Sequence, residues 1–160
     1  MSISADGLMW ACRAREDDVP KIDELFKVEG LSVVITGGAS GIGKAYAEAM
    51  AVNGAKVALF DIDPEGLAKA KADLRGSCGK VDTFVLDATD GRAIAAAMDQ
   101  VVSLWGRIDV VFANVGISGG PGYVDAEGNE VPARALENLD PALLDRVLDV
   151  NVGETFKTMQ

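Results

Sequence analysis

A cluster of glycines between an apolar run and an alanine-rich run constrains the fold of this chain more than any other feature. Residues 31–36 read LSVVIT, residues 36–43 read TGGASGIG, and the alanine-rich stretch then ends at Asn53-Gly54. The first run is typical of a buried strand, and Asn-Gly is a common end of a helix. A strand that turns through glycines into a helix leaves free N–H groups that can hold a phosphate. The cluster therefore predicts an anion-binding turn, although short glycine patterns also occur in turns that bind nothing.

Strand and helix patterns continue to alternate along the rest of the chain. Further apolar runs, typical of buried strands, lie at residues 55–60, 81–86 and 108–113. Pro64 suits the first turn of a helix, Asp90 suits a helix N-cap, and Asp140-Pro141 begins a last run with helical apolar spacing. Because continuous apolar strands alternating with helices indicate a parallel sheet, we expect a doubly wound α/β fold. We expect it to be a three-layer α/β/α, Rossmann-type arrangement that lacks its C-terminal strands.

The first residues differ from this regular pattern. Residues 1–25 carry a charge cluster and only a short possible helix, so we expect an N-terminal extension that is partly disordered. The incomplete α/β domain is expected over residues 26–160. A loop rich in Gly and Pro runs from Gly116 to Pro132, and it either borders the substrate or is a surface insert.

Composition excludes several classes of function. The chain has 160 residues and a formal net charge of −10, which argues against binding the phosphate backbone of nucleic acids. It contains no histidine, so a Ser-His-Asp triad and a histidine-bearing zinc site cannot be built, and we expect no metal. Cys12 and Cys78 are too few for a disulfide framework and fit a reducing compartment. We find no membrane-spanning run and no signal peptide, so the cytoplasm is the expected location.

Two kinds of nucleotide site compete for the glycine turn. Residues 38–45 read GASGIGKA, close to the P-loop pattern of G-x-x-x-x-G-K followed by Ser or Thr. However, Ala45 occupies the place of the hydroxyl that binds the metal in such enzymes. This absence disfavours a P-loop-like nucleotide hydrolase.

An acid at the end of the next strand favours a dinucleotide instead. Asp61 lies 18 positions after Gly43, near the spacing at which a carboxylate accepts hydrogen bonds from a ribose hydroxyl. The same carboxylate repels a 2′-phosphate, and no Arg or Lys stands within the turn or just after Asp61. The pattern predicts NAD in preference to NADP.

Together these motifs resemble the short-chain dehydrogenase/reductase family, from about Phe26 onward. The family's T-G-x-x-x-G-I-G motif matches residues 36–43, and its acid after the third strand matches Asp87. Its N-N-A-G segment appears as ANVG at residues 113–116, where two of four positions differ. Its catalytic-asparagine segment is similar to VNV at residues 150–152.

The resemblance implies a role for each matched residue. The residues implied at the pyrophosphate are Gly37, Ser40, Gly41, Ile42 and Gly43. Asp61 and Ile62 are implied at the adenosine ribose, and Asp87 and Ala88 at the adenine. Asn114, Val115 and Gly116 are implied on the nicotinamide side. Asn151 is implied as a catalytic residue that supports a proton-relaying water.

One part of the family's machinery does not occur in the 160 residues. Family members use a Ser and then a Tyr with a Lys four positions later, whose charge lowers the pKa of the tyrosine. Neither Tyr46 nor Tyr123 has a lysine at that position. We therefore expect this chain to be truncated and inactive by itself. The complete protein is expected to be an NAD-dependent oxidoreductase of secondary alcohols or ketones and a homotetramer or dimer. A non-catalytic module remains the alternative.

Overall fold

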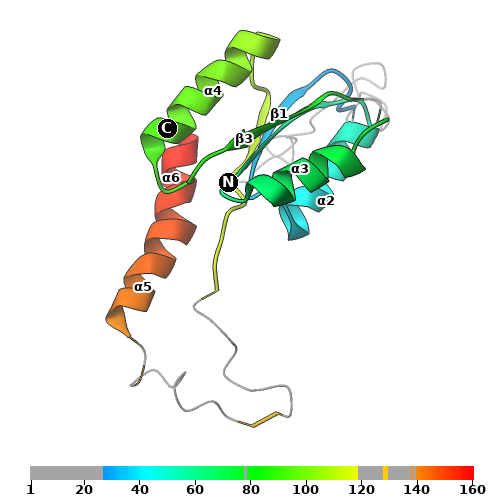
Figure 1. Cartoon of the computed structure of the whole chain (residues 1–160). Coiled ribbons are helices and arrows are strands. Elements are labelled where there is room, and N and C mark those ends of the chain that lie inside the picture. Colours follow the sequence, from blue (N-terminus) through cyan, green and yellow to red (C-terminus); the bar gives the residue numbers. More distant parts are fainter. Residues whose placement is uncertain (1–26, 78, 119–127, 130–137, 139) are drawn as a thin grey trace, which may run out of the picture.

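The computed structural model describes residues 27–77, 79–118, 128–129, 138 and 140–160 (Figure 1). The predicted N-terminal extension, both cysteines and most of the Gly116–Pro132 loop lie outside these residues. In chain order the elements are β1 (Ser32–Thr36), α2 (Gly41–Val52), β2 (Lys56–Asp61), α3 (Pro64–Asp73), β3 (Val81–Val85), α4 (Gly91–Trp105), β4 (Val110–Phe112), α5 (Pro141–Leu148), η5 (Asp149–Gly153) and α6 (Glu154–Met159).

The four strands form one parallel sheet in the order β3-β2-β1-β4. The chain first moves outward from β1 to β2 and β3, and it then returns past β1 to place β4 on the opposite side. Ser32 pairs with Lys56 on one side of β1, and Val33 pairs with Val110 on the other. This order confirms the predicted doubly wound α/β fold. It creates a switch point between β1 and β4, where such sheets open a crevice at the carboxyl ends of their strands.

Helices cover both faces of the sheet, which gives the three predicted layers (Figure 1). On one face, α2 and α3 pack through small residues such as Ala47, Ala51 and Ala70 against Val33 and Leu59. Small side chains at a spacing of four residues let α2 lie close to the sheet.

The other face of the sheet is covered by α4, with α6 beside it. There Ala97 and Val101 of α4 pack against Val34, Ala58 and Phe60. β1 is fully buried between the two layers, as the continuous apolar run predicts for a parallel strand.

Local signals explain the helix ends. The side chain of Asp90 accepts hydrogen bonds from the backbone N–H groups of Arg92 and Ala93, and Asp140 accepts one from Ala142. The sequence predicts the N-cap at Asp90 and the start of a helix at Asp140-Pro141. Gly106 ends α4 in the left-handed conformation, with a φ of 88°, which glycine adopts without steric cost.

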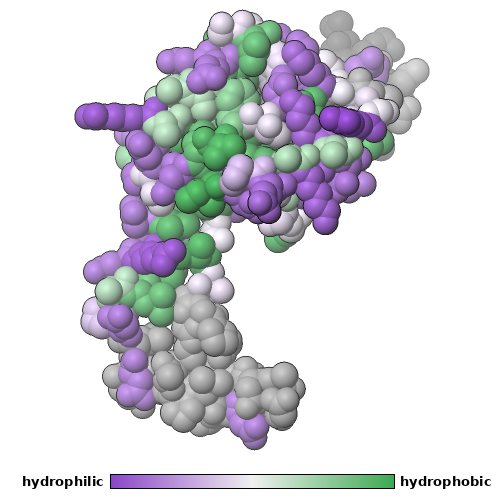
Figure 2. All heavy atoms as spheres, in the orientation of Figure 1, coloured by the Kyte–Doolittle hydropathy of each residue, from purple (hydrophilic) through white to green (hydrophobic). Residues whose placement is uncertain are grey.

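The last helical segment differs from the single helix that its apolar spacing predicts. A π-helical turn, η5, separates α5 from α6 within one continuous segment (Figure 1). The apolar side chains of Leu144, Leu148, Val152 and Phe156 are exposed along it at intervals of four residues. Figure 2 shows apolar atoms on the surface of this segment among charged side chains. Among the described residues, no helix combines the length and the apolar character needed to cross a membrane.

Candidate functional site

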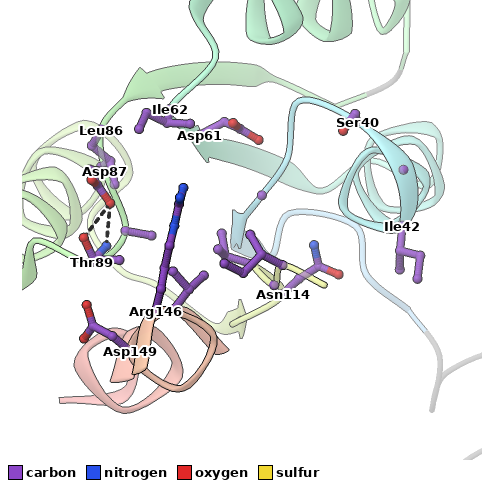
Figure 3. Close-up of a pocket in the computed structure, with 17 residues that line it drawn as sticks. Ser40, Ile42, Asp61, Ile62, Leu86, Asp87, Thr89, Asn114, Arg146 and Asp149 are labelled. Atoms are coloured by element: carbon purple, nitrogen blue, oxygen red, sulfur yellow. Dashed lines mark hydrogen bonds between the residues drawn. The ribbon is translucent and has the colours of Figure 1, made fainter. Parts of the chain in front are cut away.

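A cavity of about 700 Å³ opens at the carboxyl ends of the strands (Figure 3). Its walls come from the glycine turn, the ends of β2, β3 and β4, and the α5–η5 segment. The lining residues are Gly37, Ser40, Gly41, Ile42, Asp61, Ile62, Leu86, Asp87, Ala88, Thr89, Asn114, Val115, Gly116, Ile117, Arg146, Asp149 and Val150. The structure therefore brings all but two of the predicted site residues into one cavity. The two others, Gly43 and Asn151, lie directly behind its walls.

The glycine turn leaves donors free on the cavity side. Ser40 is the N-cap of α2, and its side chain makes no capping hydrogen bond, so the first N–H groups of the helix keep no side-chain acceptor. Gly41 has a φ of +54°, and a Cβ there would meet nothing within 4 Å. This combination makes an open concave surface of backbone donors, which suits a phosphate that must come close to the main chain.

Gly43 has a different reason to be glycine. A Cβ at this position would lie 2.2 Å from the carbonyl oxygen of Gly37 and 2.8 Å from Nδ2 of Asn114. The start of α2 can therefore approach β1 and β4 only without a side chain at Gly43. This residue acts on the cavity by shaping the turn.

Asp61 is fixed in place by the turn opposite it. One carboxylate oxygen accepts a hydrogen bond from the backbone N of Ala39 at 3.0 Å, and the other accepts one from the backbone N of Asp63 at 3.0 Å. Each oxygen has a second lone pair that remains able to accept a hydrogen bond. The carboxylate is thus oriented at the end of β2 and lines the cavity next to Ile62.

Asp87 is held by a tight turn after β3. Its Oδ1 accepts hydrogen bonds from the backbone N and the Oγ1 of Thr89, both at 2.8 Å (Figure 3). These two bonds, together with the positive charge of Lys157, lower the pKa of the Asp87 carboxyl below its usual value. Asp87 therefore remains an anionic acceptor at neutral pH, with Oδ2 available to a donor on a ligand.

Asn114 joins β4 to β1 at the switch point. Oγ1 of the fully buried Thr36 accepts hydrogen bonds from the backbone N of Asn114 at 3.0 Å and of Val115 at 3.3 Å. Nδ2 of Asn114 also donates to the carbonyl oxygen of Thr36 at 3.2 Å. The backbone of residues 114–116 is thereby held along the cavity wall, and this clamp forms although Ala113 replaces the first asparagine of the family segment.

Asn151 fastens η5 to the chain that leaves β4. Its Oδ1 accepts a hydrogen bond from the backbone N of Ile117 at 2.8 Å, and its Nδ2 donates to the carbonyl oxygen of Ile117 at 3.0 Å. The side chain thus holds both backbone groups of one residue. Asn151 lies in the middle of the π-helical turn, and such turns are frequent at functional sites.

The comparisons with known proteins agree with this geometry. The family model described as short chain dehydrogenase matches residues 31–160. The chain belongs to the short-chain dehydrogenase family. Uncharacterized oxidoreductase YxbG of Bacillus subtilis is 34% identical over 130 residues, which make up 81% of this chain and 43% of that protein. D-threitol dehydrogenase of Mycolicibacterium smegmatis is 33% identical over 139 residues, which make up 87% of this chain and 48% of that protein.

Solved structures of short-chain dehydrogenases share the fold. A crystal structure of NAD+-bound xylitol dehydrogenase matches with a TM-score of 0.72 and 29% identity, covering 83% of this chain and 46% of that one. A metagenomic short-chain oxidoreductase in complex with NADP matches with a TM-score of 0.67 and 28% identity, covering 82% and 54%. The chain thus spans about half the length of the curated relatives it matches, and both forms of the cofactor occur among its structural neighbours.

Lys44, which directly follows the glycine turn, does not line the cavity. Nζ of Lys44 forms an ion pair with Asp73 at the far end of α3, and Lys44 is not among the lining residues. A P-loop lysine must reach the phosphates. Lys44 therefore adds nothing to the hydrolase alternative. Among the described residues, no group of three or more acidic, histidine or cysteine side chains is placed to hold a metal ion.

Sequence reasoning missed one wall of the cavity. The lining residues that no motif marks are Leu86, Thr89, Ile117, Arg146 and Asp149. Nζ of Lys157 donates to the carbonyl oxygen of Thr89 at 2.8 Å and pairs with Asp149 at 3.1 Å, so α6 is fastened to the turn beside Asp87. No short pattern marks these contacts, since each joins residues from separate elements. The helical spacing of the last segment was the only available signal.

Proposed function

We propose that this chain is the cofactor-binding part of an NAD-dependent oxidoreductase, formed as one domain over residues 26–160. The complete protein would act on a secondary alcohol or ketone and assemble as a homotetramer or dimer. The observation that carries the proposal is the cavity itself. An open turn of backbone N–H groups, a carboxylate at the end of β2 and another after β3 line one space. Their order along the cavity matches the order of pyrophosphate, ribose and base in a dinucleotide.

Each group of residues is assigned to one part of the dinucleotide. Backbone donors of Gly37, Ser40, Gly41 and Ile42 would bind the pyrophosphate, and Gly43 would keep their turn in shape. Asp61 would accept hydrogen bonds from the adenosine ribose, with Ile62 packed against the same moiety. Asp87 and Ala88 would contact the adenine. Asn114, Val115 and Gly116 would flank the nicotinamide, which supplies the hydride-transfer chemistry when it is bound.

Asn151 would act next to the nicotinamide end of the bound dinucleotide, as a catalytic residue. Its side chain is held by two hydrogen bonds to Ile117, which fix its backbone beside Val150, a residue that lines the cavity. Its backbone carbonyl accepts a hydrogen bond from Oγ1 of Thr155 at 3.0 Å. Asn151 would support a proton-relaying water from this position.

The preference for NAD over NADP rests on Asp61. Its carboxylate is held at the end of β2 by two backbone donors, so it cannot easily turn away from a 2′-phosphate. In isothermal titration of the 160-residue chain, we expect NAD to bind about tenfold or more tightly than NADP. Asp61→Asn should narrow this difference, while Asp145→Asn, an exposed change on α5, should leave it unchanged. Equal or tighter binding of NADP by the unmodified chain would overturn the assignment.

The second candidate, a module without turnover, is favoured by one observation. The 160 residues contain no tyrosine followed four positions later by lysine. We therefore expect the chain alone to bind NAD without oxidising an alcohol. The test is the absorbance of NADH at saturating NAD with a panel of secondary alcohols. Formation of NADH above a blank without protein would contradict this expectation.

A further inference from the structure

The charges that line the cavity are unevenly distributed. Three carboxylates, those of Asp61, Asp87 and Asp149, line it together with one cationic side chain, that of Arg146. The chain as a whole carries a net charge of −10. A dinucleotide is itself an anion, because its pyrophosphate is ionised. Neutral backbone donors on the glycine turn would therefore have to bind this anion against the repulsion of nearby carboxylates.

Other cations near the cavity are already engaged. Lys44 is paired with Asp73 on α3, away from the cavity. Lys157 is hydrogen-bonded to the carbonyl oxygen of Thr89 and paired with Asp149. Arg146, in contrast, forms no ion pair with any of the residues that the structure describes, and its side chain is exposed. Among the lining side chains that the structure describes, the guanidinium of Arg146 is the one positive charge without an ion-pair partner.

The side chain of Arg146 carries this positive charge into the cavity. Figure 3 shows its side chain extending from α5 into the cavity, on the side of Asp87 and Thr89, with Ser40 and Ile42 farther away across the cavity. Arg146 lies in the last turn of α5, which ends at Leu148. The helix carries the residue, and the Asn151 clamp to Ile117 fixes the helix to the sheet.

We propose that Arg146 is a cofactor-binding residue whose guanidinium pairs with the pyrophosphate of the dinucleotide from the wall opposite the glycine turn. This inference rests on the proposed function of the cavity. A guanidinium presents a planar fork of donors that matches two phosphate oxygens, which an ammonium cannot reproduce. The pyrophosphate is the favoured partner because Asp61 disfavours a phosphate on the ribose. Arg146 thereby supplies the cation that the glycine turn lacks.

The test is a series of ligands that differ in their phosphates. Isothermal titration of the 160-residue chain with adenosine, ADP, NAD and NADP is compared between the unmodified chain and Arg146→Gln. We expect the dissociation constants of ADP and NAD to rise about tenfold or more, the usual effect of losing a charge-assisted hydrogen bond, while that of adenosine stays within about twofold. Arg75→Gln, an exposed change at the end of α3 outside the cavity, controls for net charge and should leave all four constants unchanged.

The possible outcomes separate the two proposals. Unchanged binding of ADP and NAD by Arg146→Gln overturns the role of Arg146 but leaves the cofactor site intact. An equal loss for adenosine and ADP also overturns it, since the residue would then act on the base or the fold. A loss confined to NADP assigns Arg146 to a 2′-phosphate and overturns the pyrophosphate pairing. If the unmodified chain binds none of the phosphorylated ligands, the proposed function itself fails, and the role of Arg146 fails with it.

A second variant keeps the test decisive should Arg146→Gln unfold. Arg146→Lys retains the charge and the aliphatic stem, so it preserves the packing of α5 while it removes the fork. Circular dichroism and thermal unfolding verify the fold of each variant before titration. We expect Arg146→Lys to weaken ADP and NAD by about threefold to tenfold, less than the glutamine variant. Binding of both ligands by Arg146→Lys as tight as in the unmodified chain would contradict the bidentate pairing.

Discussion

The two walls of the cavity are supported in different ways. The first wall, formed by the glycine turn, lies on buried strands, whereas in the second wall, formed by α5 and η5, no side chain of these two elements is buried. Thr36, Ile35 and Leu59 beneath the turn are fully buried. The helical wall is instead fastened to the sheet by two side chains, Asn151 on Ile117 and Lys157 on Thr89. The first wall is therefore a continuation of the hydrophobic core, and the position of the second wall depends on a few polar contacts. Damage to the first wall should affect the whole domain, and damage to the second should remain local.

Gly43→Ala tests the first wall and should have the largest effect. The added methyl group would lie 2.2 Å from the carbonyl oxygen of Gly37, so the start of α2 must move away from β1. We expect a loss of about 3 kcal/mol in the free energy of unfolding, typical of severe overpacking, together with loss of NAD binding. Urea unfolding followed by circular dichroism measures the first effect, and calorimetric titration measures the second.

Gly41→Ala is the matched control for this change. It introduces the same methyl group two residues away, where nothing lies within 4 Å and only the φ of +54° is unfavourable. The cost should be about 1–2 kcal/mol from the left-handed backbone. If Gly41→Ala destabilised the domain as much as Gly43→Ala, contact with Gly37 would not be the reason for the glycine.

Asn151→Ala tests the second wall and should have an intermediate effect. It removes two hydrogen bonds to the backbone of Ile117, at 2.8 and 3.0 Å. Because this site is exposed to water, we expect a loss of about 1–2 kcal/mol. Hydrogen exchange should increase in α5 and η5 but not in β1 or β2.

The predicted increase of hydrogen exchange in α5 and η5 alone needs a matched control. Exposed Asn53 serves as a control, since its side chain bonds only within its own helix, to the carbonyl oxygen of Ala49. Asn53→Ala should leave exchange in α5 unchanged. Increased exchange of β1 in Asn151→Ala would mean that the two walls unfold together, contrary to the comparison.

Acid should weaken the turn after β3, to which Lys157 fastens the second wall, with the smallest effect of the three tests. The pKa of Asp87 is lowered by hydrogen bonds from Thr89 and by Lys157, so its ionised form stabilises the folded state at neutral pH. That contribution is fully present above the ordinary value of 3.8 and is lost as the pH falls through the lower pKa of the folded state. We expect the difference in stability between the unmodified chain and Asp87→Asn to stay below about 1 kcal/mol, since water screens an exposed carboxylate.

Thermal unfolding between pH 2.5 and 7 measures this difference. It should be constant near neutrality and should shrink toward zero at the acidic end. A difference that grew on acidification would show that the Asp87 carboxylate destabilises the fold.

The same division explains what the sequence could predict. The strand at residues 32–36, the glycine turn and the caps Asp90 and Asp140 follow from local backbone chemistry, and the structure has each of them. Asp61 follows from its spacing after the glycine turn and Asp87 from the family motif, and the parallel sheet brings both to one edge. All of these features are decided within a few residues of chain.

The remainder could not be predicted because it depends on contacts between distant residues. Arg146 lines the same cavity as Asp61, although they lie 85 positions apart and no motif joins them. The π-helical turn around Asn151 likewise leaves no mark in the apolar spacing, which continues every four residues from Leu144 to Phe156. The turn is associated with the hydrogen bonds to Ile117, a partner outside the helix.

The strand order also bears on when the cavity forms during folding. β1 pairs with β2 through residues close in sequence, such as Ser32 and Lys56, but the contacts of β1 with the β4 side join residues 77 and 78 positions apart. Closing the longer segment costs more chain entropy, so we expect the β1–β4 pairing to form after the β1–β2 pairing. A ligand that touches both walls can bind only after this step. Bound NAD should therefore lengthen the lifetime of the folded domain without shortening the time needed to reach it.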